Sequence, residues 1–199
     1  MEMLIRIFVL LLLIVSICAV KDPEPLRSYV IEKDFFNGIK MGEFSVFNAA
    51  KSRVFYRIES YYNVGGKLEV IDTSKKQVIA QLINLWNLLF YKGNLSVLHP
   101  TSNQWIRGGI EKVFHMLNEK FLIKWNNQSV IMENNFGSLT TTFQYENHSE
   151  ILAEAIKRPI SFIWPNKYDL KVYSDHFPDC IYFLAIAIKD NINRGQSKG

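Results

Sequence analysis

Hydrophobic and polar residues alternate along much of the chain, which is the pattern of strands with one face buried. In segment 54–59, for example, Tyr56 and Ile58 alternate with Arg57 and Glu59. Similar segments are 67–70, 76–82, 95–99, 120–125, 129–133, 139–145, 160–164 and 168–173. Turn signals separate them at intervals of about 8 to 12 residues, which predicts an antiparallel sandwich or barrel.

Short clusters of Gly, Asn, Asp and Ser mark the predicted turns. These clusters are Gly65–Gly66, Asp72–Lys75, Gly108–Gly109, Asn126–Asn127, Asn134–Gly137 and Glu146–His148. Two segments, 77–91 and 151–157, also have helical spacing or helical propensity. We expect strands in both.

One segment near the end of the chain has no polar position. It consists of Cys180, Ile181, Tyr182, Phe183, Leu184, Ala185, Ile186, Ala187 and Ile188. A bilayer-spanning helix needs about 20 apolar residues, and a surface helix would show a polar stripe. Pro178 before the run and Lys189 after it suit the two ends of a helix. We therefore expect a helix of about 10 to 14 residues enclosed by strands, with a buried central strand as the alternative.

The N-terminal residues have the features of a secretory signal peptide. Arg6 precedes the apolar segment Ile7–Val15, and small residues follow in Ser16–Ala19. We expect a signal peptide over residues 1–18 and a secreted chain. The alternative is an uncleaved signal anchor with the body of the protein on the luminal side.

The remaining chain divides simply. Pro23 and Pro25 predict an extended leader over residues 19–34. A single barrel domain is expected over residues 35–192, followed by a flexible polar tail over residues 193–199.

Three Asn-x-Ser triplets make Asn94, Asn127 and Asn147 candidate glycosylation sites, since each lies in or beside a predicted turn. Once Cys18 leaves with the signal peptide, Cys180 has no intramolecular disulfide partner. Within the apolar run, its thiol would be an inert hydrophobic group.

Composition and charge are those of an ordinary globular domain, at 48% hydrophobic and 21% charged with a net charge of +4. Because the cations are spread along the chain rather than gathered on one face, we expect no nucleic-acid partner. We find no nucleophile elbow, phosphate loop, dinucleotide fingerprint or zinc-ligand pair. The chain is therefore expected not to be an enzyme, and to need no cofactor and no metal.

Three late segments, EILAEAIKRP, NKYDLKVY and FPDCIYFLAIAIKDNI, resemble the ending of the tubby C-terminal-like superfamily. That superfamily includes tubby proteins, phospholipid scramblases and the LURP-one-related group. The earlier segments KLEVIDTSKKQVIAQL and FLIKWNNQSV resemble its hairpins. The resemblance implies a closed antiparallel β-barrel of about twelve strands around a central hydrophobic C-terminal α-helix.

The resemblance also implies a binding function, because tubby domains bind phosphoinositide headgroups through basic residues. Lys157 and Arg158 are the nearest candidates for such a contact. The proline-rich segment, cysteine cluster and acidic calcium-binding stretch of scramblases are not evident. The predicted signal peptide is a further departure, since members are mostly cytosolic.

We therefore expect a secreted, non-enzymatic module whose outer surface contacts a membrane lipid headgroup or an unidentified protein. Candidates for an exposed contact patch are Trp86, Trp105, Trp125 and Trp164. One alternative is a lipocalin-like carrier of a small apolar ligand, although the early Gly-x-Trp of lipocalins is absent. Another is membrane engagement by the C-terminal apolar run itself.

Overall fold

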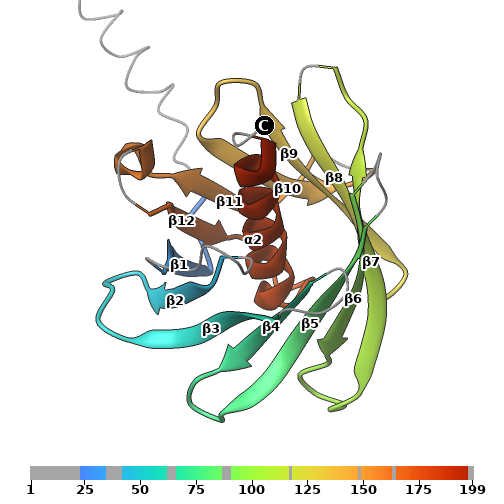
Figure 1. Cartoon of the computed structure of the whole chain (residues 1–199). Helices are drawn as coiled ribbons and strands as arrows, with labels where there is room; N and C mark the ends of the chain where they lie inside the picture. The colour runs from blue at the N-terminus through green and yellow to red at the C-terminus, as the bar shows by residue number, and fades with distance from the viewer. Residues whose placement is uncertain are drawn as a thin grey trace, which may run out of the picture.

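Twelve antiparallel strands of the described residues close into a barrel around the C-terminal helix (Figure 1). The computed structural model describes residues 23–34, 42–61, 66–86, 91–116, 118–147, 149–162 and 165–196. The strands are β1 (Arg27–Lys33), β2 (Phe44–Asn48), β3 (Val54–Tyr61), β4 (Lys67–Asp72), β5 (Gln77–Trp86), β6 (Tyr91–Leu98), β7 (Trp105–Val113), β8 (Asn118–Trp125), β9 (Gln128–Asn135), β10 (Thr140–Tyr145), β11 (Ile151–Lys157) and β12 (Lys167–Val172). A short 3-10 helix, η1 (Pro159–Phe162), connects β11 to β12, and α2 (Asp179–Gln196) ends the described chain. The predicted signal peptide lies outside the described residues.

The barrel closes where the first strand meets the last. Each strand pairs with its neighbours in the sequence, and β1 pairs with both β2 and β12. Tyr29 lies opposite Leu170 on one side, and Ile31 lies opposite Val46 on the other. The barrel therefore begins at Arg27 and not at residue 35, and the expected leader contains a barrel strand. That strand lacked a clear signal because three buried residues follow one another at its centre.

Alternation identified strands correctly where one face is buried and the other faces water. In β12, Tyr168, Leu170 and Val172 point inward, and the residues between them are more exposed. The ambiguous segments 77–91 and 151–157 contain the strands β5 and β11, as expected. Asn126 and Asn127 form the expected turn, and their positive φ angles of 49° and 59° suit a two-residue hairpin.

Two expectations about local structure were wrong. Gly108 and Gly109 lie in the middle of β7 and not in a turn, and neither has a positive φ. The segment expected as a strand at 160–164 begins in the 3-10 helix η1, because Pro159 starts a short turn before β12.

The helix α2 fills the centre of the barrel. Every residue of the apolar run is at most 4% exposed. The Phe183 ring lies 5.2 Å from that of Tyr29 on β1 and 5.3 Å from that of Tyr56 on β3. On another side, the Tyr182 ring lies 5.0 Å from that of Phe143 on β10. The enclosed helix predicted from the apolar run is thus confirmed.

Polar contacts hold the N-terminal end of α2. Asp179 accepts hydrogen bonds from the Tyr29 hydroxyl at 2.6 Å and from Arg27 Nε at 2.7 Å. Arg27 also pairs with Asp175 just before the helix. Strand β1 is therefore bound to the helix that it encloses.

Further along α2, a second set of polar contacts is buried. Asp190 accepts a hydrogen bond from Tyr168 at 2.8 Å and pairs with Lys33. Lys189, at 8% exposed, donates to the Thr141 hydroxyl. The helix is longer than expected, with 18 residues, so residues 193–196 of the predicted tail are helical. Lys189 therefore lies inside the helix and not at its end.

We predict that Ala187→Asp destabilises the protein by about 3 to 5 kcal/mol, because it places an unpaired carboxylate in an apolar interior. Ala187 is 1% exposed. Ala50→Asp, in the exposed turn between β2 and β3, is the matched control and should change little. Urea unfolding measures both, and equal effects would contradict an enclosed helix.

Lys189 should make stability depend on pH. Burial lowers the pKa of Lys189 from 10.5 to about 8 in the folded protein. Between these pH values the unfolded chain binds more protons, so the free energy of unfolding from this group rises with pH. We expect wild type to gain about 1 to 2 kcal/mol of stability relative to Lys189→Met from pH 8 to pH 9.5. Urea unfolding across this range is the measurement, and a constant difference would refute the shift.

Candidate functional site

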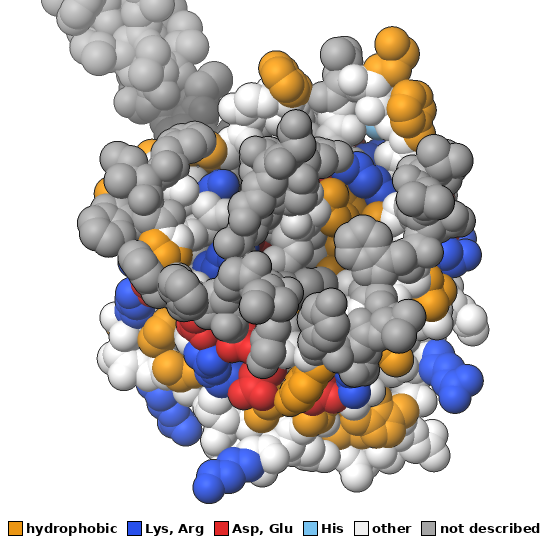
Figure 2. All heavy atoms as spheres, viewed as in Figure 1, with side chains coloured by type: hydrophobic (Ala, Val, Ile, Leu, Met, Phe, Trp, Pro, Cys, Tyr) orange, Lys and Arg blue, Asp and Glu red, His pale blue; other side chains and the backbone are white. Residues whose placement is uncertain are grey.

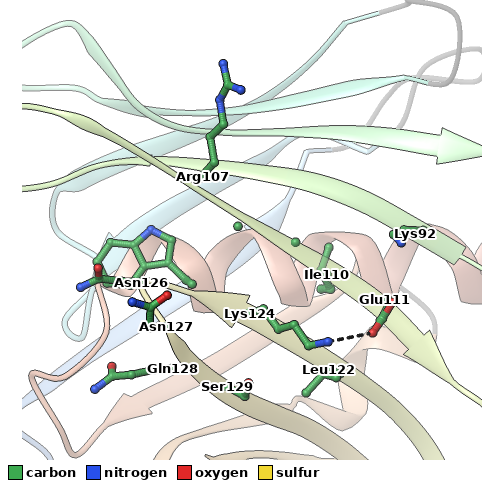
Figure 3. Close-up of a pocket in the computed structure, with 13 residues that line it drawn as sticks. Lys92, Arg107, Ile110, Glu111, Leu122, Lys124, Asn126, Asn127, Gln128 and Ser129 are labelled. Atoms are coloured by element: carbon green, nitrogen blue, oxygen red, sulfur yellow. Dashed lines mark ion pairs between the residues drawn. The ribbon is translucent and has the colours of Figure 1, made fainter.

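The outer face of β6 to β9 carries a hollow of about 500 Å³ (Figure 3). Lys92, Arg107 and Lys124 bring cations to its lining, and Glu111 brings a carboxylate. The turn that joins β8 to β9 forms one end of the hollow, with Asn127 among its lining residues. This volume falls within the range of small-molecule sites.

Two glycines shape this hollow. A Cβ atom at Gly108 would overlap the main-chain carbonyl oxygen of Lys124, so glycine lets β7 approach β8 closely. A Cβ atom at Gly109 would meet its nearest neighbour, the Gly93 carbonyl oxygen, at an ordinary 3.5 Å. The floor of the hollow is therefore bare because Gly109 has no side chain, whereas Gly108 is required by strand packing.

The cations of the hollow do not converge on one point. Lys124 Nζ lies 3.6 Å from Glu111 Oε1, and Figure 3 marks this ion pair. In the same view, the Arg107 side chain points away from Lys124, and Lys92 lies at the far side. A tight anion site requires donors aimed at a shared centre. The arrangement thus favours no particular anion.

The headgroup candidates Lys157 and Arg158 lie together where β11 ends. Arg158 donates to both carboxylate oxygens of Asp169, at 2.8 Å and 2.6 Å. This hydrogen bonding raises the pKa of Arg158. Since Asp169 already occupies the guanidinium, an incoming phosphate would have to compete with a bidentate partner.

The three candidate glycosylation sites are exposed on the barrel. Asn94 lies on the outer face of β6, and Asn127 and Asn147 lie in the turns after β8 and β10. Asn127 and Asn147 both line one open hollow, so these two turns are neighbours at one end of the barrel. All three positions leave room for a glycan.

The opposite end of the barrel carries three highly exposed hydrophobic side chains. Phe114 and Met116 lie between β7 and β8 and are 80% and 88% exposed. Phe136, between β9 and β10, is 90% exposed. Figure 2 shows hydrophobic side chains projecting at the top of the molecule, where these hairpins turn in Figure 1. We call this part of the surface the hairpin end.

These three residues are not among the candidates predicted from the sequence. One signal was present for Phe136, because a large aromatic residue stood inside the predicted turn Asn134–Gly137. No comparable signal marked Phe114 and Met116, since their neighbours gave neither a clear strand nor a clear turn. Their exposure follows from where β7 ends in the folded barrel.

The tryptophans do not form a common patch in the part of the chain that the structure describes. The side chain of Trp105 is 45% exposed. Trp125 is buried, and its ring stacks with His99 at 6.4 Å and packs against Phe177 at 6.2 Å. The side chains of Trp86 and Trp164 lie outside the described set.

The remaining candidate chemistry concerns metal-binding and catalytic side chains among the described residues. Within the described residues, no three or more side chains of His, Cys, Asp or Glu form a group that could hold a metal ion. The main-chain N–H of His176 donates to the Ser174 hydroxyl at 3.3 Å, which makes Ser174–His176 a local turn. Within the same ranges, no helix has the length and apolar character needed to cross a membrane.

Comparisons of the chain with protein-family models, with curated proteins and with solved structures found no match.

Substitution of the two glycines of the hollow should separate their roles. We predict that Gly108→Ala destabilises the protein by about 1 to 3 kcal/mol, because the new methyl group overlaps backbone that cannot move away. Gly109→Ala, the matched control, should be neutral or slightly stabilising. Thermal unfolding of both variants provides the measurement. An unchanged stability of Gly108→Ala would mean that packing between β7 and β8 does not require Gly108.

Proposed function

We propose that the chain is a secreted, non-enzymatic, tubby-like binding module that acts through its outer surface on a lipid headgroup or a protein partner. The observation that carries this proposal is the position of α2. All nine residues of its apolar run are buried among the strands. A ligand therefore finds its contacts on the outside of the barrel.

The side chains of α2 fill the space in the barrel interior that a carried ligand would occupy. Lipocalin-like carriers keep an open cup at the centre of the barrel for one small ligand. Here the rings of Tyr182 and Phe183 occupy that position and contact β1, β3 and β10. The carrier alternative would require α2 to leave the barrel. The same burial counts against membrane engagement by the apolar run.

Two features support secretion. Asn94, Asn127 and Asn147 are all accessible to the glycosylation machinery. Cys180 is a buried free cysteine, and desolvation raises the pKa of its thiol to about 12. A thiol that stays protonated and enclosed is protected from oxidation, which suits an oxidising compartment.

The architecture supports a tubby-like origin. The resemblance in the late segments implies a closed antiparallel barrel around a C-terminal helix, and the chain has this arrangement. Lys157 and Arg158 remain the candidate headgroup contacts. Arg158 would have to exchange its ion pair with Asp169 for such a contact.

A ligand titration separates the surface module from the carrier. We expect retinol and oleate to cause no saturable quenching of tryptophan fluorescence at micromolar concentration, because α2 fills the interior. Trp125 is a suitable probe, since its ring packs against Phe177 just before α2. Saturable binding with one ligand per chain would overturn the proposed function.

A further inference from the structure

The two hairpins of the hairpin end are direct neighbours. Strands β8 and β9 pair with Asn118 opposite Asn135, at the ends that carry the exposed residues. Met116 comes two residues before Asn118, and Phe136 follows Asn135 directly. The register thus places the exposed side chains of both turns on one rim of the barrel.

The hairpin end extends to the next connection around the barrel. Thr140 pairs with Ile156, so β11 ends beside the start of β10 and leads into η1 at the same rim. Ile160 in η1 is 48% exposed. Lys157 is the last residue of β11, and Arg158 follows it before this isoleucine. Apolar tips and the candidate headgroup contacts therefore share one end of the molecule.

Charges near this rim are largely paired. Lys112 Nζ lies 3.3 Å from Glu119 Oε1, and Lys120 Nζ lies 4.0 Å from Glu133 Oε2. Arg158, where β11 ends, is likewise paired with Asp169. Because these cations are already paired with carboxylates, they give no strong preference for an anionic lipid over a zwitterionic one.

The shape of the hairpin end suits a fluid partner. A stable protein interface buries about 800 Å² per partner in a continuous, closely packed patch. Phe114, Met116 and Phe136 instead project as separate side chains from two turns, and exposed polar residues such as His115 and Asn135 adjoin them in the sequence. A bilayer surface accepts isolated apolar side chains without shape complementarity.

We propose that the hairpin end docks on a zwitterionic lipid bilayer by inserting Phe114, Met116 and Phe136 at the level of the headgroups. This inference rests on the proposed function and names its partner and its surface. The barrel then stands end-on to the membrane, and α2 stays enclosed. The lipid contact is made by turns and not by the C-terminal run.

The candidate glycosylation sites agree with this orientation. Strand β8 runs from the hairpin end to the turn that holds Asn127, a distance of about 23 Å at 3.3 Å per residue. Asn147 lies beside Asn127 at that far end, and Asn94 lies on the side wall. Bulky hydrophilic glycans at these positions would all stay clear of the membrane.

Vesicle flotation of the full chain tests the proposal. We expect binding to phosphatidylcholine vesicles that needs no anionic lipid and persists in 0.5 M salt. The triple variant Phe114→Ser, Met116→Ser, Phe136→Ser should bind at least about tenfold more weakly, since burying each apolar side chain favours binding. A matched control changes Ile83, Trp105 and Ile151 to Ser, which are 43%, 45% and 43% exposed and lie away from the hairpin end, and it should bind normally. Thermal unfolding checks that both triple variants are folded.

A second measurement reports insertion of the tip itself. Tryptophan fluorescence of the Phe136→Trp variant should be quenched by brominated phosphatidylcholine, whereas the added tryptophan of Ile83→Trp, on the outer wall, should not be. Quenching reports whether position 136 itself enters the bilayer, even if another segment of the chain also binds the vesicle.

The outcomes separate the inference from the proposed function. Equal binding by the hairpin-end variant and wild type, or binding that requires anionic lipid and is lost in salt, would overturn the insertion and leave a surface module. A lack of vesicle binding, with a dimer that dissociates in the hairpin-end variant, would assign the hairpin end to a second copy of the chain. Among these results, only saturable binding of retinol or oleate would contradict the proposed function.

Discussion

Burial of α2 within the barrel is the interaction on which the rest of the structure depends. A closed sheet of this size needs a filled interior, and the side chains of α2 supply the centre of that filling. The helix in turn has no polar face between Cys180 and Ile188, so it would be unstable in water without the strands. Helix and barrel therefore stabilise one another, and neither forms a core alone.

Apolar packing does not by itself fix how far α2 slides along the barrel. The polar contacts provide that register, because Asp179 bonds to β1 near one end of the helix and Asp190 bonds to β1 and β12 farther along. A shift by one helical turn would separate these partners and leave buried charges unpaired, which is costly. The buried ionic groups thus contribute specificity of position.

Much of the fold followed from local pattern, because alternation records which face of a strand is buried. The enclosed helix followed from the missing polar face of its apolar run. Strand β1 was missed since its central residues are buried without alternation, and β7 was missed since Gly108 and Gly109 resembled a turn. The need for Gly108 arises from the close approach of β8, a contact between strands that local pattern does not contain.

The exposure of the hydrophobic residues at the hairpin end was harder to predict from the sequence, because it also depends on contacts between distant segments. Whether a hydrophobic residue in a connection is buried depends on what the finished barrel brings next to it. Phe177, in the connection before α2, is 1% exposed, whereas Phe136 in another turn is 90% exposed. Only the register of β8 with β9 shows that Phe136 shares a rim with Met116.

The pairing of β1 with β12 also sets the order in which the molecule matures. Arg27 and Asp179 meet across 152 positions of the chain, so the first strand waits until Asp179 has left the ribosome. Until then the growing sheet has an open edge and an unfilled concave face, the state in which chains associate wrongly. Contacts of such high sequence separation also slow folding. The barrel can therefore close only after α2 has been synthesised, and a chain truncated before α2 would leave a sheet with an unfilled interior.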